Sequence, residues 1–176
     1  KFAAKVAELQ VGNGMDEGVT QGPMINQGAI DKVKDHIADA LSKGGTLICG
    51  GESHSMGGSF FSPTIISNVT TDMKVATEET FGPLAAIFKF KDEAQAIDMA
   101  NDTEFGLAAY FYTRDIGRVW RVGEGLEYGI VGINEGIIST EVAPFGGVKE
   151  SGIGREGSHY GIEDFLEIKY MLMGGL

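Results

Sequence analysis

The chain has 176 residues, of which 43% are hydrophobic, a length and composition that suit one globular domain or a large part of a bigger protein. Its 14 basic residues stand against 25 acidic ones, and this net charge of −11 argues against a nucleic-acid or anionic-membrane surface. We therefore expect small molecules, or other copies of the chain, as partners.

The first half of the chain predicts two helices. Phe2, Val6 and Leu9 fall at helical spacing. A longer helix is predicted from a cap at Asn26 to about Lys43, because two glycines follow and can end it. Its apolar stripe consists of Ile30, Val33, Ile37 and Leu41. Residues 12–23 between the two helices are rich in turn formers.

Short strands are predicted after the long helix. Residues 46–48 predict a short buried strand, and residues 50–59 an exposed Gly/Ser-rich loop. Residues 60–66 are typical of a strand, in which Pro63 indicates an edge position or an irregular segment.

From residue 84 onward apolar strands alternate with amphipathic helices. The expected order is strand 84–90, helix 92–100, strand 108–112, helix 115–122 and strand 128–133. Such alternation predicts an α/β fold with a parallel sheet and helices on its faces. Ligands of these sheets bind beyond the carboxyl ends of the strands, which indicates the loops after Phe90, Tyr112 and Ile133.

The last part of the chain predicts a short helix and a strand. Ser158 can cap a helix that runs to Phe165, and residues 167–173 alternate as in a strand with Ile168, Tyr170 and Leu172 on one side. A terminal strand without a partner exposes an unpaired edge, and pairing with another subunit would cover it.

A glycine-rich segment at residues 144–157 contains five glycines in fourteen residues, a density that suits positive φ angles or close approach of backbone. Gly152, Gly154 and Gly157 match G-x-G-x-x-G, but the strand before it and the acidic residue about 20 positions after it are missing. We therefore favour a structural glycine loop over a dinucleotide fingerprint.

Two basic residues in this loop could bind an anion. Lys149 and Arg155 are each followed directly by an acid, Glu150 and Glu156. Local ion pairs are therefore the favoured interpretation.

Residues 78–83, Glu-Glu-Thr-Phe-Gly-Pro, precede the first of the alternating strands. On this rigid turn one carboxylate can point inward and accept hydrogen bonds from two vicinal hydroxyls, as on a ribose. Composition alone favours a solvated surface pair.

Other candidate residues have ordinary explanations. Cys49 could be a nucleophile, but no histidine stands in a triad context, and a free cysteine at a strand end is usually inert. His36, His54 and His159 lack metal-ligand spacing and are expected on the surface, so we predict no metal site. Ser139 and Thr140 could hold a substrate carboxylate, although turn residues are the simpler reading.

Two long motifs, at residues 78–83 and 144–156, resemble the carboxyl-terminal third of the NAD(P)-dependent aldehyde dehydrogenase superfamily. The likeness covers essentially the whole chain, including Gln-Gly-Pro at 21–23 and the final strand. The segments at 136–139, 160–164 and 167–170 look most like succinate-semialdehyde dehydrogenases. The resemblance implies that residues 1–165 belong to the catalytic domain, that 166–176 form an oligomerisation strand, and that the nucleotide-binding domain lies outside this chain.

The resemblance implies oxidation of an aldehyde, through a cysteine thioester, with NAD or NADP as cofactor. In this family the nucleophilic cysteine and the general-base glutamate precede the region that matches Lys1, so no catalytic residue is expected here and the segment alone should be inactive. Glu79 matches the residue that holds the nicotinamide ribose, and Phe81 the aromatic beside the nicotinamide. Phe145 matches a wall of the substrate tunnel, and Ser139 a hydroxyl that holds the distal carboxylate.

The expected substrate is succinate semialdehyde, and glutarate semialdehyde or another aldehyde is the alternative. An inert fragment with only a folding or assembly role is a further alternative. We expect a homo-oligomer, dimer or tetramer, formed through the C-terminal strand, without nucleic-acid or membrane partners. The lone cysteine favours a reducing compartment, so the cytoplasm is predicted, or the mitochondrial matrix in a eukaryote.

Overall fold

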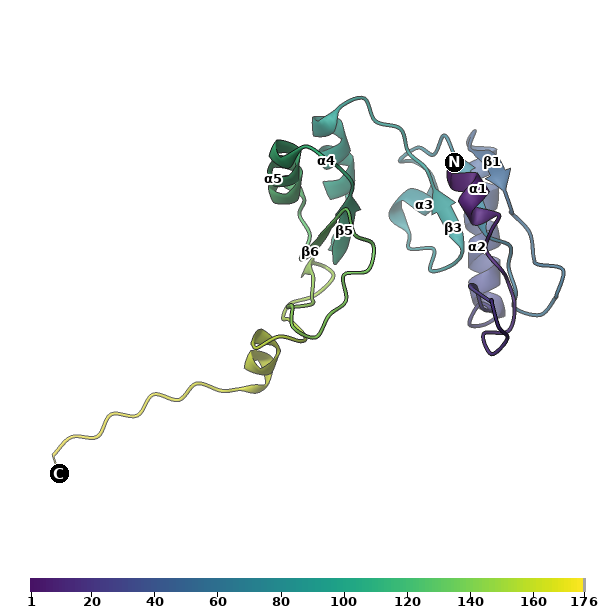
Figure 1. Cartoon of the computed structure of the whole chain (residues 1–176). Helices are drawn as coiled ribbons and strands as arrows, with labels where there is room; N and C mark the ends of the chain where they lie inside the picture. Colours follow the sequence, from purple (N-terminus) through teal and green to yellow (C-terminus); the bar gives the residue numbers. More distant parts are fainter. Residues whose placement is uncertain (176) are drawn as a thin grey trace. The chain divides into compact units, whose positions relative to one another are not determined.

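The computed structural model describes residues 1–175, which form two compact units, Lys1–Lys89 and the part from Phe90 onward (Figure 1). The first unit contains helices α1 (Phe2–Val6), α2 (Gln27–Ser42) and α3 (Lys74–Thr77). Its strands are β1 (Thr46–Cys49), β2 (Thr64–Ser67) and β3 (Leu84–Ala86). They form one sheet in the order β1-β2-β3, antiparallel between β1 and β2 and parallel between β2 and β3.

Helix α2 begins and ends as the sequence predicts. The side chain of Asn26 accepts a hydrogen bond from the Ala29 N–H at 2.9 Å, which satisfies one of the free donors of the first turn. Ile30, Val33 and Ile37 are buried in the core with Phe61 and Ile66. The helix therefore covers the sheet of its own unit.

The two short strands that flank the 50–59 loop differ from the prediction. Strand β1 is not buried, and its residues Leu47 and Ile48 are 40% and 48% exposed. Within this sheet β1 is an edge strand that pairs only with β2. Strand β2 begins only after Pro63, which has no N–H to donate to a ladder. Phe61 is nevertheless fully buried, in an isolated bridge with Ser53.

The second unit contains the predicted alternation from the helix after residue 90 onward, whereas the predicted strand 84–90 is limited to β3 and belongs to the first unit. Helices α4 (Glu93–Asn101) and α5 (Ile116–Gly125) are capped by Asp92 and Asp115. Strands β5 (Ala108–Phe111) and β6 (Ile130–Ile133), before and after α5, pair in parallel, which confirms this βαβ unit. Two further strands, β4 (Phe105–Gly106) and β7 (Val148–Lys149), pair antiparallel. The fold is thus α/β as expected, but its strand pairs are mixed rather than all parallel.

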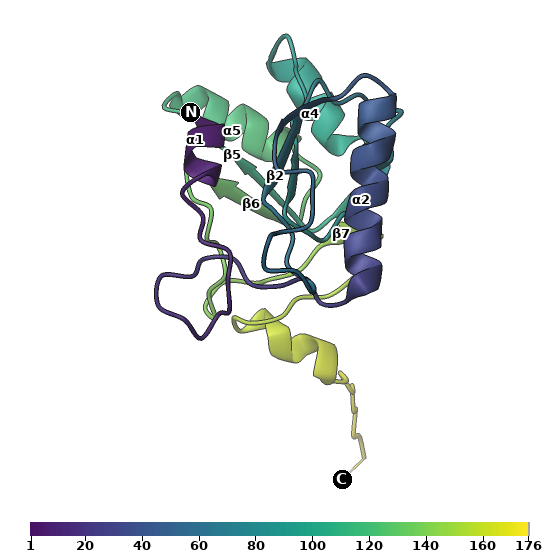
Figure 2. The ribbon, with the colours of Figure 1, turned by 90° about the vertical axis from the view of Figure 1, so that its right-hand side faces the viewer.

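The end of the described chain is less regular than predicted. The predicted short helix is a 3-10 helix, η1 (Tyr160–Phe165), and the Tyr160 N–H donates to the Ser158 hydroxyl at 3.2 Å. After η1 the chain continues as an extended, exposed segment (Figure 2). Residues 166–175 form no strand pair within the described part of the chain, and residue 176 of the predicted oligomerisation strand lies outside it.

An ion-pair cluster joins α4 to α5 and predicts acid sensitivity of the second unit. Hydrogen bonds from Arg121 and Arg118, each 2.7 Å from its Nε to the Glu93 carboxylate, lower the pKa of Glu93 from its ordinary value of 4.5 to about 2. Because the pKa of Glu93 is lower in the folded protein, its ionised carboxylate stabilises the fold fully above pH 4.5. This stabilisation is lost as the pH falls toward about 2 and the carboxylate takes up a proton. We expect the free energy of unfolding, measured by urea titration, to decrease across this window.

Glu93→Gln should remove this part of the pH dependence. Asp98→Asn, which changes an exposed carboxyl of the same helix, should retain it and serves as the control. Equal slopes of unfolding free energy against pH in the wild type and in Glu93→Gln would refute the contribution of the cluster.

Candidate functional site

Residues 78–83 join α3 to β3, and their backbone is held at both ends. The Glu78 N–H donates to the Lys74 carbonyl at 2.8 Å, at the end of α3. At the other end, the Pro83 carbonyl accepts from the Thr64 N–H of β2 at 2.8 Å. The segment is therefore part of the folded first unit and not a free loop.

Gly82 brings this segment into contact with α2. A Cβ at Gly82 would lie 2.6 Å from Cγ2 of Val33, closer than real side chains come, and 3.0 Å from Cε of Met24. Only glycine fits here without moving the buried Val33 side chain. The contact sets the position of the residues just before it, Glu79 to Phe81.

His36 is the principal side-chain anchor of the segment. Its ring is fully buried on α2, with Nδ1 2.8 Å from the Thr80 hydroxyl and Nε2 3.3 Å from the Glu78 carboxylate. The expectation that His36 is a solvated surface residue is wrong, because α2 turns it toward the segment and both ring nitrogens find partners there. Sequence reasoning missed this contact, although His36 lies three residues after Val33 and four before Ala40, at the spacing of the buried face.

Between these two anchored residues, the Glu79 side chain is exposed. Its carboxylate makes no hydrogen bond or ion pair within residues 1–175. The ring of Phe81 is 86% exposed. A fixed backbone thus presents a carboxylate with available acceptor positions and, two residues later, an apolar ring face.

This arrangement fits the ribose and ring of a nicotinamide nucleotide. A carboxylate has two oxygens that accept hydrogen bonds, and two vicinal hydroxyls present two donors. Hydrogen bonds to a charged acceptor are stronger than those between neutral groups. The exposed ring of Phe81 offers a flat apolar surface against which a planar heterocycle can pack.

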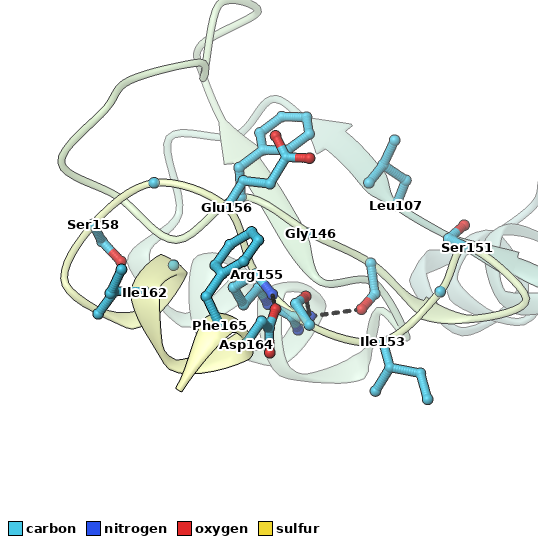
Figure 3. A pocket seen from close by; sticks show the side chains of 16 residues that line it. Leu107, Gly146, Ser151, Ile153, Arg155, Glu156, Ser158, Ile162, Asp164 and Phe165 are labelled. Atoms are coloured by element: carbon cyan, nitrogen blue, oxygen red, sulfur yellow. Dashed lines mark hydrogen bonds between the residues drawn. The ribbon is translucent and has the colours of Figure 1, made fainter. Parts of the chain in front are cut away.

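The glycine-rich segment of the second unit, together with Leu107 and η1, lines an open cavity of about 560 Å³ (Figure 3). Phe145 lines it, whereas Ser139 is exposed and does not. The segment folds back on itself, since Phe145 and Glu156 exchange two backbone hydrogen bonds of 2.9 and 2.7 Å. The structure thus places Glu79 and Phe81 in the first unit, and Ser139 and Phe145 in the second, where only Phe145 lines the pocket.

The two basic residues of this segment hold backbone instead of neighbouring acids. Arg155 donates to the carbonyls of Gly147 and Gly154 at 2.8 and 2.7 Å, and it lies beside Asp164 and Phe165 (Figure 3). Lys149 forms its ion pair with Glu127 at 2.6 Å and donates to the Asn101 carbonyl at 3.0 Å. The predicted local pairs with the next residue in the chain are wrong, because the loop fold turns Lys149 toward Glu127 and the Asn101 carbonyl, and Arg155 toward backbone carbonyls.

The glycines of the segment serve its own backbone. Gly152, Gly154 and Gly157 have φ angles of 105°, 93° and 65°, which side chains rarely adopt. A two-residue strand precedes them and a 3-10 helix follows them, instead of the long strand and helix of a dinucleotide fold. The structural interpretation of these glycines agrees with the geometry.

A turn that sequence reasoning did not identify lies just before Ser139. The Glu135 carboxylate accepts hydrogen bonds from the N–H groups of Gly136 at 2.8 Å and Ile137 at 3.0 Å. These bonds, first that of Ile137, lower the pKa of Glu135. They fix the chain as it leaves β6 and so influence where Ser139 lies.

The remaining candidates have no catalytic arrangement. Cys49 is half-buried at the end of β1, with its Sγ 3.9 Å from the Pro63 carbonyl. In the part of the chain that the structure describes, no three His, Cys, Asp or Glu side chains gather as metal ligands. Among residues 1–175, no helix combines the length and apolar character needed to cross a membrane.

Comparison with known proteins gives consistent matches along the whole chain. Residues 1–171 match the model of the aldehyde dehydrogenase family. The chain is 66% identical to a succinate semialdehyde dehydrogenase of Acinetobacter baylyi over 99% of its length, and 61% identical to a glutarate-semialdehyde dehydrogenase of Pseudomonas aeruginosa over 100% of it. In each case it covers 36% of the relative.

A solved structure agrees with these matches. The crystal structure of an NADP-dependent enzyme from E. coli superposes with a TM-score of 0.96 at 64% identity, covering 98% of this chain and 36% of that one. The chain therefore spans about a third of the length of the proteins that it matches.

Proposed function

Because the chain belongs to the aldehyde dehydrogenase family, we propose that it is the C-terminal part of an enzyme that oxidises succinate semialdehyde to succinate with NAD+ or NADP+. The geometry of residues 78–83 carries this proposal. An anchored backbone presents the Glu79 carboxylate, which has no partner within residues 1–175, and two residues later the exposed ring of Phe81. A bound nicotinamide would supply the hydride acceptor.

This chain contributes binding and orientation to the reaction. Glu79 accepts hydrogen bonds from the two ribose hydroxyls, and Phe81 packs beside the nicotinamide. Phe145 forms one wall of the substrate tunnel, and the Ser139 hydroxyl donates to the distal carboxylate of the substrate. We place the cysteine nucleophile and the glutamate base in chain that precedes Lys1, where the family resemblance locates them.

The domain assignment follows the same resemblance. We propose that residues 1–165 belong to the catalytic domain and that 166–176 form a strand that pairs with another subunit. The side chains of Ile168, Tyr170 and Leu172 are between 82% and 100% exposed, which supports a partner for this segment. We further propose a dimer or tetramer in the cytoplasm, or in the mitochondrial matrix of a eukaryote.

Turnover by the full-length protein tests the proposed activity. We expect formation of reduced nicotinamide with succinate semialdehyde at a higher kcat/KM than with an uncharged aldehyde of the same length. The same assay with NAD+ and with NADP+ identifies the cofactor. Absence of turnover with every aldehyde would support the alternative of a protein that only folds or assembles.

Glutarate semialdehyde is the second candidate substrate, because a relative of that activity matches the whole chain. The two substrates differ by one methylene, which is worth about 1–3 kcal/mol in discrimination. The ratio of their kcat/KM values in the full-length enzyme decides between them.

Ser139→Ala should weaken catalysis selectively for aldehydes that carry a distal carboxylate. Loss of one hydrogen bond is expected to lower kcat/KM by the equivalent of about 1 kcal/mol. An uncharged aldehyde of the same length should be unaffected and provides the control. An equal loss with both substrates would remove Ser139 from the substrate site.

A further inference from the structure

One ring on α2 holds both residues that flank Glu79. His36 contacts Glu78 through Nε2 at 3.3 Å and Thr80 through Nδ1 at 2.8 Å, whereas Glu79 itself is exposed. These contacts join residues that are 42 and 44 positions apart in the chain. The backbone of Glu79 is thereby fixed from both sides while its carboxylate is left available.

The chemistry of the two contacts gives each one a direction. A carboxylate oxygen accepts, so the tautomer that satisfies both contacts carries its proton on Nε2 and donates to Glu78, while Nδ1 accepts from the Thr80 hydroxyl. Both nitrogens of a fully buried ring have hydrogen-bond partners in the same short segment. The segment therefore has one preferred orientation relative to the ring.

The Glu78 side chain shows that this contact is more than core packing. It is 51% exposed and could point into solvent, yet it reaches back to a buried ring. Gly82 adds a second fixed point, because the chain approaches Val33 of the same helix too closely for any side chain. Helix α2 thus determines the orientation of the whole 78–82 segment.

We propose that His36 is a positioning residue for the nicotinamide-ribose site, which acts by orienting the Glu79 carboxylate. This inference rests on the proposed role of Glu79. Misplacement by about 1 Å far from the reacting atoms can slow a reaction by about a hundredfold. Loss of the His36 contacts therefore slows hydride transfer and leaves the capture of the aldehyde by the enzyme unchanged.

Three variants of the full-length enzyme test the role of the ring. His36→Leu removes both contacts at similar volume, and we expect single-turnover hydride transfer to slow about tenfold or more. His36→Gln restores one donor to Glu78 and should recover part of the rate. Thr80→Val leaves the histidine in the core and removes only its contact with the Thr80 hydroxyl. It should slow the same step, so the proposal can be tested even if His36→Leu does not fold.

Ile37→Val is the matched control, since Ile37 is the next residue of α2, is also buried in the core and has no polar side-chain atom that could contact the segment. It destabilises the same core and should leave hydride transfer unchanged. A comparable loss of rate in Ile37→Val would show that the effect of His36 is general destabilisation and would overturn the proposal.

Combination with Glu79→Gln distinguishes this proposal from the one on which it rests. If His36 acts through Glu79, the double variant His36→Leu/Glu79→Gln is about as slow as Glu79→Gln alone. Losses that multiply would overturn the positioning role. If hydride transfer is normal in His36→Leu but slow in Glu79→Gln, only the positioning role of His36 is overturned. If hydride transfer is normal in Glu79→Gln, the role of Glu79 is overturned as well.

Discussion

Replacing Glu79 with glutamine is expected to slow hydride transfer in the full-length enzyme by the equivalent of about 1.5–3 kcal/mol, the range for hydrogen bonds to a charged group. The amide keeps the shape of the side chain but loses the charge, and its NH2 group donates where a ribose hydroxyl needs an acceptor. The anchors on either side of residue 79 remain, so the change acts on the carboxylate alone. Single-turnover absorbance of the reduced nicotinamide measures the step.

Glu52→Gln provides the control for this variant, because Glu52 is an exposed carboxylate of the same unit in the 50–59 loop. The Glu52→Gln variant loses the same charge as Glu79→Gln and should keep the wild-type rate of hydride transfer. Unchanged hydride transfer in Glu79→Gln would refute the ribose-binding role. A rate loss of equal size in both variants would show that the net charge of the protein is responsible.

Gly129→Ala is expected to cause the largest loss of stability in the second unit. A Cβ at Gly129 would overlap the carbonyl of Gly146 and lie 2.9 Å from Cα of Gly147. The Gly129 N–H also donates to the Gly106 carbonyl at 3.0 Å, so three segments of backbone meet at this point. Overpacking of this kind costs about 1–3 kcal/mol, and more where only backbone could move aside.

The consequence of Gly129→Ala extends to the cavity, because Gly146 and Gly147 line it. We expect a lower urea midpoint and faster proteolysis within residues 144–157. Gly123→Ala in α5 is the control, since its Cβ would meet nothing nearer than Ile133 at 4.0 Å. That change should be neutral or stabilising by about 0.5–1 kcal/mol, as glycine is unfavourable inside a helix. A wild-type midpoint in Gly129→Ala would contradict the crowding at this site.

The features that the sequence predicted well depend on short-range interactions. Asn26, Asp92 and Asp115 each accept a hydrogen bond from the N–H three residues later, so each helix start can be read from neighbouring residues alone. The parallel pairing of β5 with β6 follows from a strand, a helix and a second strand in succession. The motifs at 78–83 and 144–156 identified the family for the same reason, since each is a continuous run.

The features that sequence reasoning missed join distant parts of the chain. The partners of His36 lie more than 40 residues away, and strands β4 and β7, of two residues each, are too short to show any periodicity. Lys149 turned to Glu127, and Arg155 to backbone carbonyls, because loop folding brings those groups closer than the adjacent acids. Strand β1 is exposed because of its place at the edge of the sheet, which its apolar residues do not reveal.

The sequence by itself determined the family, the starts of α2, α4 and α5 to within one residue, and the identity of the carboxylate and aromatic at 79 and 81. Only the tertiary structure decided which groups hold them, because the hydrogen-bond partners of a buried ring are the groups nearest to it in space, whatever their distance along the chain. Unsatisfied polar atoms are costly in the core, so the ring of His36 takes the acceptor and hydroxyl that packing places beside it.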